Sequence, residues 1–214
     1  MLCGDRFYNA AHRRPAKQKT MELAQFLERL PRRDLWIFGY GSLMWHPDFR
    51  YRRKSVGLVR GYHRALCILS TRYRGTSARP GLVMGLCRGG SCWGMAFLVP
   101  AARVHSVLER LWRREMLRKV YEPRLVPVRV GGGQRVRALT FIADPRHPQH
   151  VRELDLDGRA QLVAQGIGQR GRCTEYIRRT LEHMYELGVA DPHLERVLET
   201  AEAIRSSAAA RRAR

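Results

Sequence analysis

Apolar and polar positions along the chain predict short strands first and amphipathic helices around and after them. The apolar, β-prone runs fall at residues 35–38, 56–69, 82–87, 92–99, 125–130 and 136–142. Glycines inside the run at 56–69 favour one curved strand or two. Two glycine-rich segments are expected to close hairpins, Arg88-Gly89-Gly90-Ser91 and Gly131-Gly132-Gly133. The predicted fold class is therefore α+β, a small curved β-barrel of mostly antiparallel strands with surrounding helices.

Apolar residues at helical spacing predict two helices before residue 120 and two or three after the barrel. These segments are residues 21–30, with Thr20 as a cap, 100–115, 158–165, 173–187 and 192–203. The inward stripe of the last helix is predicted to be Leu194, Val197, Leu198 and Ile204. We expect one domain over residues 20–205, a disordered basic leader at 1–19, and an Ala/Arg tail at 206–214 that is disordered or a frayed helix end.

One acid interrupts the apolar face of the helix that Pro100 opens. The stripe of this helix consists of Val104, Leu108, Leu111 and Trp112. Four residues after Leu111 the same spacing arrives at Glu115, near the helix C-terminus. Burial and the negative end of the helix dipole both raise the pKa of a carboxyl placed there. The alternative is a structural salt bridge with a neighbouring arginine, namely Arg113, Arg114 or Arg118. Glu109 lies off the stripe and is expected to be a surface charge.

Composition places the chain among globular proteins. It has 214 residues, 44% of them hydrophobic, and no apolar run of about 18 residues that would cross a membrane. The first residues lack the apolar core of a secretory signal, so we expect a cytoplasmic protein. The five cysteines are odd in number and lack C-x-x-C spacing, which favours reduced structural thiols over a zinc site or a disulfide framework. His46 and His63 have no companion at metal-ligand spacing, so no metal is predicted.

The formal net charge of +21 points to a second class of function. Such a charge attracts nucleic acid over long distances in a salt-dependent way. The arginines are scattered, however, and no helix-turn-helix, zinc-finger or RNP-type pattern accompanies them. A small acidic substrate would benefit from the same field. We therefore predict no specific nucleic-acid partner, with a basic nucleic-acid-binding protein as the alternative.

A glycine turn follows the first strand, in the segment Phe38-Gly39-Tyr40-Gly41-Ser42-Leu43-Met44-Trp45. Glycine permits positive φ and leaves no Cβ in the way, so successive N–H groups there can converge on a carboxylate or an oxyanion. The turn is neither a G-x-G-x-x-G fingerprint nor a phosphate loop. Met44 stands where G-x-S-x-G would need glycine, so Ser42 is not predicted to be a hydrolase nucleophile.

This segment resembles the signature of the ChaC-type gamma-glutamylcyclotransferases, which act on glutathione, and the resemblance extends over residues 35–204. The matching pieces are Gly39-Tyr40-Gly41-Ser42-Leu43; Val59-Arg60-Gly61-Tyr62-His63-Arg64; Arg74-Gly75-Thr76 with Pro80-Gly81; Gly94; Trp112-Arg113-Arg114-Glu115-Met116 followed by Tyr121; Asp144-Pro145-Arg146-His147-Pro148; and Glu175-Tyr176. Two positions depart from the family pattern. Cys173 stands where the family usually has asparagine, and Leu82 where it often has arginine, which affects how the glycine end of a substrate would be held.

The resemblance implies a reaction without metal or organic cofactor, in which the α-amine of a γ-glutamyl group attacks its own γ-carbonyl and releases 5-oxoproline. The family's catalytic glutamate falls on Glu115, as general base and then acid. The resemblance and the turn together predict substrate binding by Tyr40, Gly41, Ser42, Leu43, Tyr121 and Tyr176. Glutathione is the expected substrate; other γ-glutamyl amino acids or amines are the alternative. We expect no membrane association and a monomer or homodimer.

Overall fold

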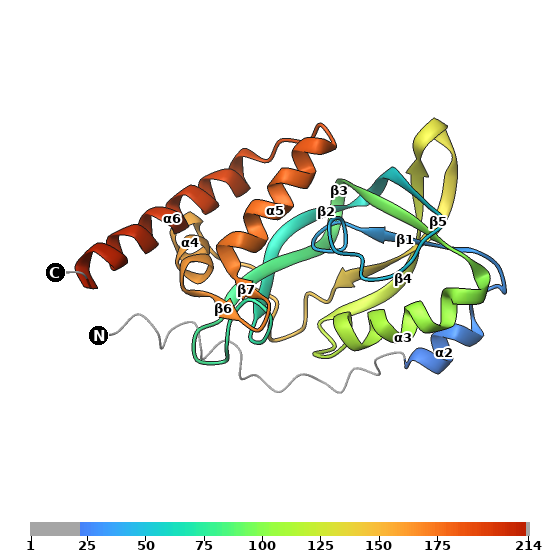
Figure 1. Ribbon diagram of the computed structural model, residues 1–214, viewed down its shortest axis with the longest axis horizontal. Helices are drawn as coiled ribbons and strands as arrows, with labels where there is room; N and C mark the ends of the chain where they lie inside the picture. The colour runs from blue at the N-terminus through green and yellow to red at the C-terminus, as the bar shows by residue number, and fades with distance from the viewer. Residues whose placement is uncertain (1–21, 213–214) are drawn as a thin grey trace.

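The computed structural model describes residues 22–212 of the chain. Five strands form a closed barrel in the order β1-β3-β2-β4-β5. Their bounds are β1 Leu35–Gly39, β2 Arg53–Ser70, β3 Gly81–Val99, β4 Tyr121–Val130 and β5 Arg135–Ala143. The barrel closes through a parallel pairing of β1 with β5, and its other pairs are antiparallel. The predicted barrel of mostly antiparallel strands is confirmed (Figure 1).

Two long strands, β2 and β3, supply most of the barrel wall. The run at 56–69 forms a single strand, the first of the two alternatives. The hairpin predicted at residues 88–91 is wrong, because β3 continues through that segment and stays paired with β2 on both sides of it. Gly89 and Gly90 adopt φ of 95° and 69°, and Gly61 on β2, at the same level, has φ of 80°. The glycines thus produce a bulge and a bend that let both strands continue around the barrel.

Alternate residues of β1 are buried against different neighbours. Ile37 belongs to an apolar cluster with Leu108 and Leu111 of helix α3 (Val104–Glu115), whereas Phe38 belongs to the cluster that faces the late helices. β1 is therefore buried on both sides, which explains its continuous apolar sequence. A short helix, α2 (Leu23–Glu28), packs beside α3, and a 3-10 turn, η2 (Ala101–Arg103), precedes α3. The predicted cap, Thr20, lies outside the described residues.

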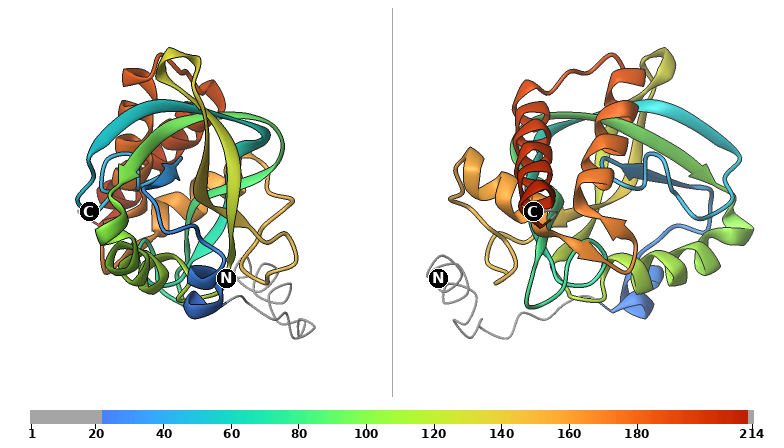
Figure 2. Two further views of the ribbon diagram at one scale, coloured as in Figure 1. Left: turned by 90° about the vertical axis from the view of Figure 1, so that its right-hand side faces the viewer. Right: turned by 60° about the vertical axis from the view of Figure 1, so that its left-hand side comes forward.

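Three late helices pack on the opposite side of the barrel from α2 and α3 (Figure 2). They are α4 Leu156–Gln165, α5 Cys173–Glu186 and α6 Pro192–Arg212, with the two-residue strands β6 (Ile167–Gly168) and β7 (Gly171–Arg172) between α4 and α5. Leu194, Val197 and Leu198 are buried as predicted. Ile204 is instead 36% exposed, and Ala201 takes the buried position.

Residues at both ends of the chain bear on the predicted domain bounds. α6 continues as helix to Arg212, so of the two alternatives for the tail the structure has helix over residues 206–212, with exposed side chains up to residue 211. The predicted leader at 1–19 lies outside the described residues.

Among residues 22–212 the structure has no helix that is both long and apolar enough to span a bilayer. The β4–β5 hairpin, which turns through η3 (Gly131–Gly133), is as predicted.

Candidate active site

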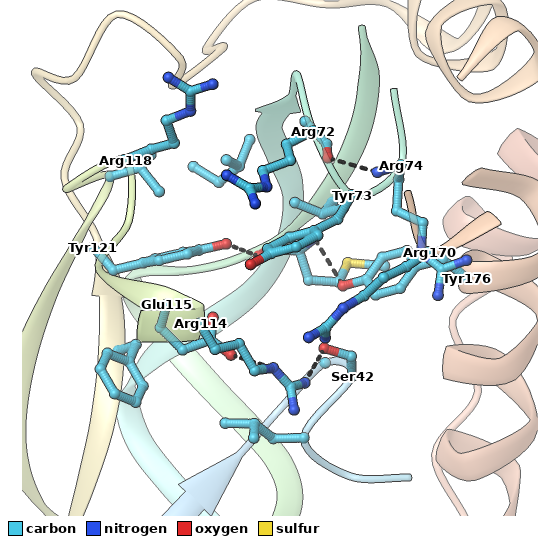
Figure 3. Close-up of a pocket in the computed structure, with 18 of the residues that line it drawn as sticks. Ser42, Arg72, Tyr73, Arg74, Arg114, Glu115, Arg118, Tyr121, Arg170 and Tyr176 are labelled. Carbon is cyan, nitrogen blue, oxygen red and sulfur yellow. Dashed lines mark hydrogen bonds and ion pairs between the residues drawn. The ribbon is translucent and has the colours of Figure 1, made fainter. Parts of the chain in front are cut away.

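A pocket of about 390 Å³ lies where the barrel meets the end of α3, the start of α5 and the β6–β7 turn (Figure 3). Segments far apart in the sequence contribute to it: the loop after β1, the end of β2, the start of β3 and the start of β4. All seven predicted site residues line this pocket, namely Tyr40, Gly41, Ser42, Leu43, Glu115, Tyr121 and Tyr176. The fold therefore brings the whole predicted set together.

Glu115 is the last residue of α3, and its side chain is 17% exposed. The helix buries Val107, Leu108 and Leu111, so the apolar stripe carries this acid toward the barrel as the spacing predicted. Burial raises the pKa of the Glu115 carboxyl above its ordinary value, and the positive charges of Arg114 and Arg170 oppose that rise. The off-stripe acid behaves differently, since Glu109 is 49% exposed beside His105, which confirms it as a surface charge.

Arg114 connects the acid to the glycine turn. Its Nε lies 2.9 Å from Glu115 Oε1, and its two terminal nitrogens donate to Ser42 Oγ at 2.8 Å and to the His46 carbonyl at 2.7 Å. The Arg114 side chain is only 6% exposed, and each of its three nitrogens has one of these partners. The predicted salt-bridge alternative and the predicted inward acid are thus both present. One buried guanidinium holds the acid and the turn at a fixed separation.

The turn itself presents backbone donors. Gly39 ends β1, and a Cβ there would lie 2.6 Å from the Leu43 Cβ, so the tight return of the chain requires glycine. The Met44 N–H donates to the Gly41 carbonyl and the His46 N–H to the Ser42 carbonyl. Within residues 22–212, the N–H groups of Gly41, Ser42 and Leu43 donate to no acceptor in the chain. These three donors remain available to an anion in the pocket.

The three tyrosines differ in what their hydroxyls offer. Tyr40 Oη donates to the Phe141 carbonyl at 2.7 Å, and Tyr121 Oη donates to the Met84 carbonyl at 3.0 Å. Their hydrogens are therefore used, and their oxygens can only accept. Tyr176 Oη instead accepts the Met84 N–H at 3.1 Å, which leaves its own hydrogen free to be donated. Burial raises the pKa of all three phenols, so each stays protonated at neutral pH.

Arginines surround the pocket, which sequence reasoning did not predict. Among the described residues that line it, Glu115 is the single acid. The six arginines of the lining are Arg72, Arg74, Arg114, Arg118, Arg170 and Arg179. Arg170, in the β6–β7 turn, lies over the Tyr73 ring at 4.5 Å, and Arg72 donates to the Gln169 side chain at 2.9 Å. Four different segments contribute these cations, so no local pattern in the sequence could have revealed the ring.

The two departures from the family pattern contact each other behind the pocket. The Cys173 Sγ donates to the Leu82 carbonyl at 2.8 Å, and both side chains are completely buried. Neither residue is part of the pocket lining. The residues present at these two positions therefore pack α5 on β3 and contribute no group to the pocket.

Residues 35–204 match the profile of a family described as ChaC-like protein. The glutathione-specific gamma-glutamylcyclotransferase of Escherichia coli (strain K12) is 35% identical over 184 residues, which cover 86% of this chain and 80% of that protein. This chain belongs to the ChaC-like family. Glutathione-specific gamma-glutamylcyclotransferase 1 of Homo sapiens is 33% identical over 196 residues, 86% of each chain.

The ChaC-like fold is also present among solved structures. A crystal structure of the glutathione-specific gamma-glutamyl cyclotransferase from yeast aligns with a TM-score of 0.74, 21% identity, and coverage of 81% of this chain and 97% of that one. At this identity the likeness concerns the fold. The family inferred from the segment at residues 38–45 is thereby confirmed, as is the barrel with surrounding helices.

Proposed function

We propose that this ChaC-like protein is a gamma-glutamylcyclotransferase that acts on glutathione and releases 5-oxoproline and Cys-Gly. The observation that carries the proposal is the pairing of one buried acid, Glu115, with a turn of free N–H donors across the Arg114 bridge, in a pocket of about 390 Å³. The relatives from Escherichia coli and Homo sapiens are named as glutathione-specific enzymes of this reaction, which supports the substrate class.

The reaction is intramolecular, so the protein's contribution is the folded conformation of the substrate and the movement of protons. The α-amine attacks the γ-carbonyl carbon, a five-membered ring forms, and the bond to the cysteinyl nitrogen breaks. Near neutral pH the α-amine is an ammonium ion and cannot attack. Glu115 takes a proton from it and then gives one to the departing amine. Burial raises the pKa of Glu115 towards the range in which one carboxyl performs both steps.

The remaining groups suit the charges of a γ-glutamyl moiety. The oxygens of Tyr40 and Tyr121 only accept, which suits the α-ammonium group beside Glu115. The free N–H groups of Gly41, Ser42 and Leu43 suit an anion, either the α-carboxylate or the oxyanion that develops on the γ-carbonyl. The Tyr176 hydroxyl is a further donor for the same oxygens.

The arginines at the pocket suit the other end of glutathione. Near neutral pH glutathione carries two negative charges, on its α-carboxylate and its glycine carboxylate, and one positive charge, on its ammonium group. The tripeptide is therefore an anion. Arg72, Arg118 and Arg170 are exposed at the pocket, and Figure 3 shows Arg72 and Arg118 across the pocket from Ser42. A terminal carboxylate extending from the γ-glutamyl site would meet this positive charge. This is the role the scattered positive charge plays in the proposal, in place of nucleic-acid binding.

The test is to incubate the purified chain with glutathione, γ-glutamyl-alanine and γ-glutamyl-lysine and to measure 5-oxoproline. Release from glutathione alone, or far faster from it, supports the proposal. Release mainly from one of the other two would place the protein in the alternative substrate class. A salt titration with mixed DNA and RNA tests the nucleic-acid alternative, which requires binding with strand or sequence preference at physiological salt. The absence of 5-oxoproline from all three substrates would contradict the enzymatic proposal.

A further inference from the structure

Three side chains of metal-ligand type meet outside the pocket lining. Cys67 comes from β2, Cys87 from β3 and His150 from the connection between β5 and α4. The two Sγ atoms lie 3.5 Å apart, and Cys87 Sγ lies 3.7 Å from His150 Nε2. All three ligand atoms fall within 4.8 Å of one another. Because the residues are 20 and 63 positions apart, their spacing in the sequence gave no sign of the cluster.

The backbone holds the three side chains in place. His150 pairs with Ile68 as an isolated bridge, flanked by hydrogen bonds from Val151 N to the Cys67 carbonyl and from Leu69 N to the Gln149 carbonyl, both 2.8 Å. The chain around His150 thus continues the sheet beside Cys67. Gly85 makes room for the sulfur, since a Cβ at that position would lie 2.6 Å from Cys67 Sγ.

We propose that Cys67, Cys87 and His150 bind a thiophilic divalent cation of the zinc class, with a fourth position left to water or an external ligand. In a tetrahedral zinc site the Zn–S and Zn–N bonds place two sulfurs about 3.8 Å apart and a sulfur and a nitrogen about 3.6 Å apart. The observed separations of 3.5 and 3.7 Å differ from these edges by only a few tenths of an ångström. The third separation, between Cys67 Sγ and the His150 ring nitrogen, is no more than 4.8 Å, so binding a cation would shorten this edge by at most about 1.2 Å.

The surroundings favour cation binding over a direct disulfide. The β2–β3 ladder pairs Cys87 with His63, four residues before Cys67, so the two cysteines are not a cross-strand pair. Closing the 3.5 Å separation of the two sulfurs to the length of an S–S bond, about 2.05 Å, would require the sulfurs to approach each other by about 1.5 Å. A bound cation uses the existing separation instead.

The histidine side of the cluster has room in its hydrogen bonding for a ligand. His150 Nδ1 is buried without a hydrogen-bond partner in the described chain, and Nε2 has only its long contact with Cys87. The imidazole is thus poorly satisfied without a ligand.

The experiment uses the full, untagged chain, reduced and freed of chelator, with Co²⁺ as the spectroscopic probe. We expect one Co²⁺ per chain, with thiolate charge-transfer absorption in the near ultraviolet that Zn²⁺ displaces. Cys87→Ser and His150→Gln should each weaken binding by at least about tenfold, the loss that even an outer-shell change at a metal site produces. Cys92→Ser is the matched control, since this thiol is also buried on β3, donates to the Trp93 carbonyl and is not part of the cluster.

The melting temperature is a second measurement, and it shows whether each variant still folds. Stoichiometric Zn²⁺ should raise the melting temperature of the wild type and Cys92→Ser, and leave that of Cys87→Ser unchanged, because a ligand stabilises only the state that binds it. A thiolate band that is absent from the wild type, or unchanged in Cys87→Ser and His150→Gln, would overturn the proposal. The proposal would also be overturned if the reduced protein bound no cation and formed a Cys67–Cys87 disulfide on exposure to air. Neither readout measures 5-oxoproline, so this test is independent of the cyclotransferase proposal.

Discussion

Arg114 and Glu115 are adjacent in the sequence and are also partners in a buried ion pair, with Nε and Oε1 2.9 Å apart. Adjacent residues inside a helix point in different directions and do not normally meet. Here both residues lie in the last turn of α3 and both line the pocket, where their long side chains reach each other. The end of the helix therefore sets the geometry of the proposed acid–base group and of its bridge to Ser42.

Replacing the acid tests the proposed catalytic role directly. Glu115→Gln keeps the shape of the side chain and its contact with Arg114, so we expect the melting temperature to change little. Turnover of glutathione should fall by roughly 10²–10⁴-fold, the usual contribution of a positioned acid–base group. Glu109→Gln, in the same helix but 49% exposed, is the control and should retain full activity. Nearly normal 5-oxoproline release by Glu115→Gln would remove Glu115 from the mechanism.

The pH dependence of kcat/KM tests the electrostatics of the same pair. Glu115 acts first as a base, so activity is lost as pH falls through its pKa, by about tenfold per pH unit below it. Burial raises that pKa and Arg114 lowers it, so Arg114→Met should shift the acid limb to higher pH. Arg196→Met, an exposed arginine on α6, should leave the limb in place. An acid limb that does not move in Arg114→Met would show that the limb reports another group.

Regular patterns in the sequence predicted those parts of the fold and site that depend on neighbouring residues. Helical spacing placed Glu115 on the buried face, and the alternation of apolar runs with glycines predicted the barrel. The same local reasoning failed at residues 88–91, where glycines in a long strand look like a turn. Whether two glycines end a strand or bend it depends on the partner strand, and here β2 bends at Gly61 at the same level.

Features formed by segments that are far apart in the sequence could not be predicted from it. Arg114 was named only as one of several arginines near the acid, and nothing local showed that it would reach both Ser42 and His46. The differing roles of the tyrosine hydroxyls depend on the Met84 backbone, which only the packed barrel brings to them. The Cys67–Cys87–His150 cluster has the same origin, since β2, β3 and a later loop meet at one place.

Tyr176 is the one tyrosine of the three with a hydrogen to donate, so its removal should differ from removal of the others. Tyr176→Phe should lower kcat/KM by roughly 10- to 100-fold, the value of a hydrogen bond to a charged group, and also leave the Met84 N–H unpaired. Tyr185→Phe, on the same helix but 51% exposed, should be neutral. If Tyr40→Phe and Tyr121→Phe lose as much kcat as Tyr176→Phe with equal KM, the distinction between donor and acceptor hydroxyls is wrong.

The arginines at the pocket give a prediction about substrate binding rather than turnover. Arg170→Ala removes an exposed guanidinium that contacts the Tyr73 ring and whose charge, with that of Arg114, lowers the pKa of Glu115. If Arg170 meets the terminal carboxylate, its loss weakens ground state and transition state equally, so KM for glutathione should rise several-fold while kcat stays close to normal at a pH above the Glu115 pKa, which loss of this charge raises. Added salt should reduce the difference, because the interaction is exposed and screened.

The matched substrate for this prediction is glutathione with its glycine carboxylate converted to an amide. Wild type should bind the amide more weakly than glutathione, and Arg170→Ala should bind the two alike, because the charge that distinguishes them no longer has its partner. Arg196→Ala should preserve the wild-type preference, which separates a local contact from the general field of a chain with net charge +21. If Arg170→Ala keeps the full preference for the carboxylate, the terminal group is held elsewhere, and Arg72 and Arg118 are then the residues to test by the same comparison.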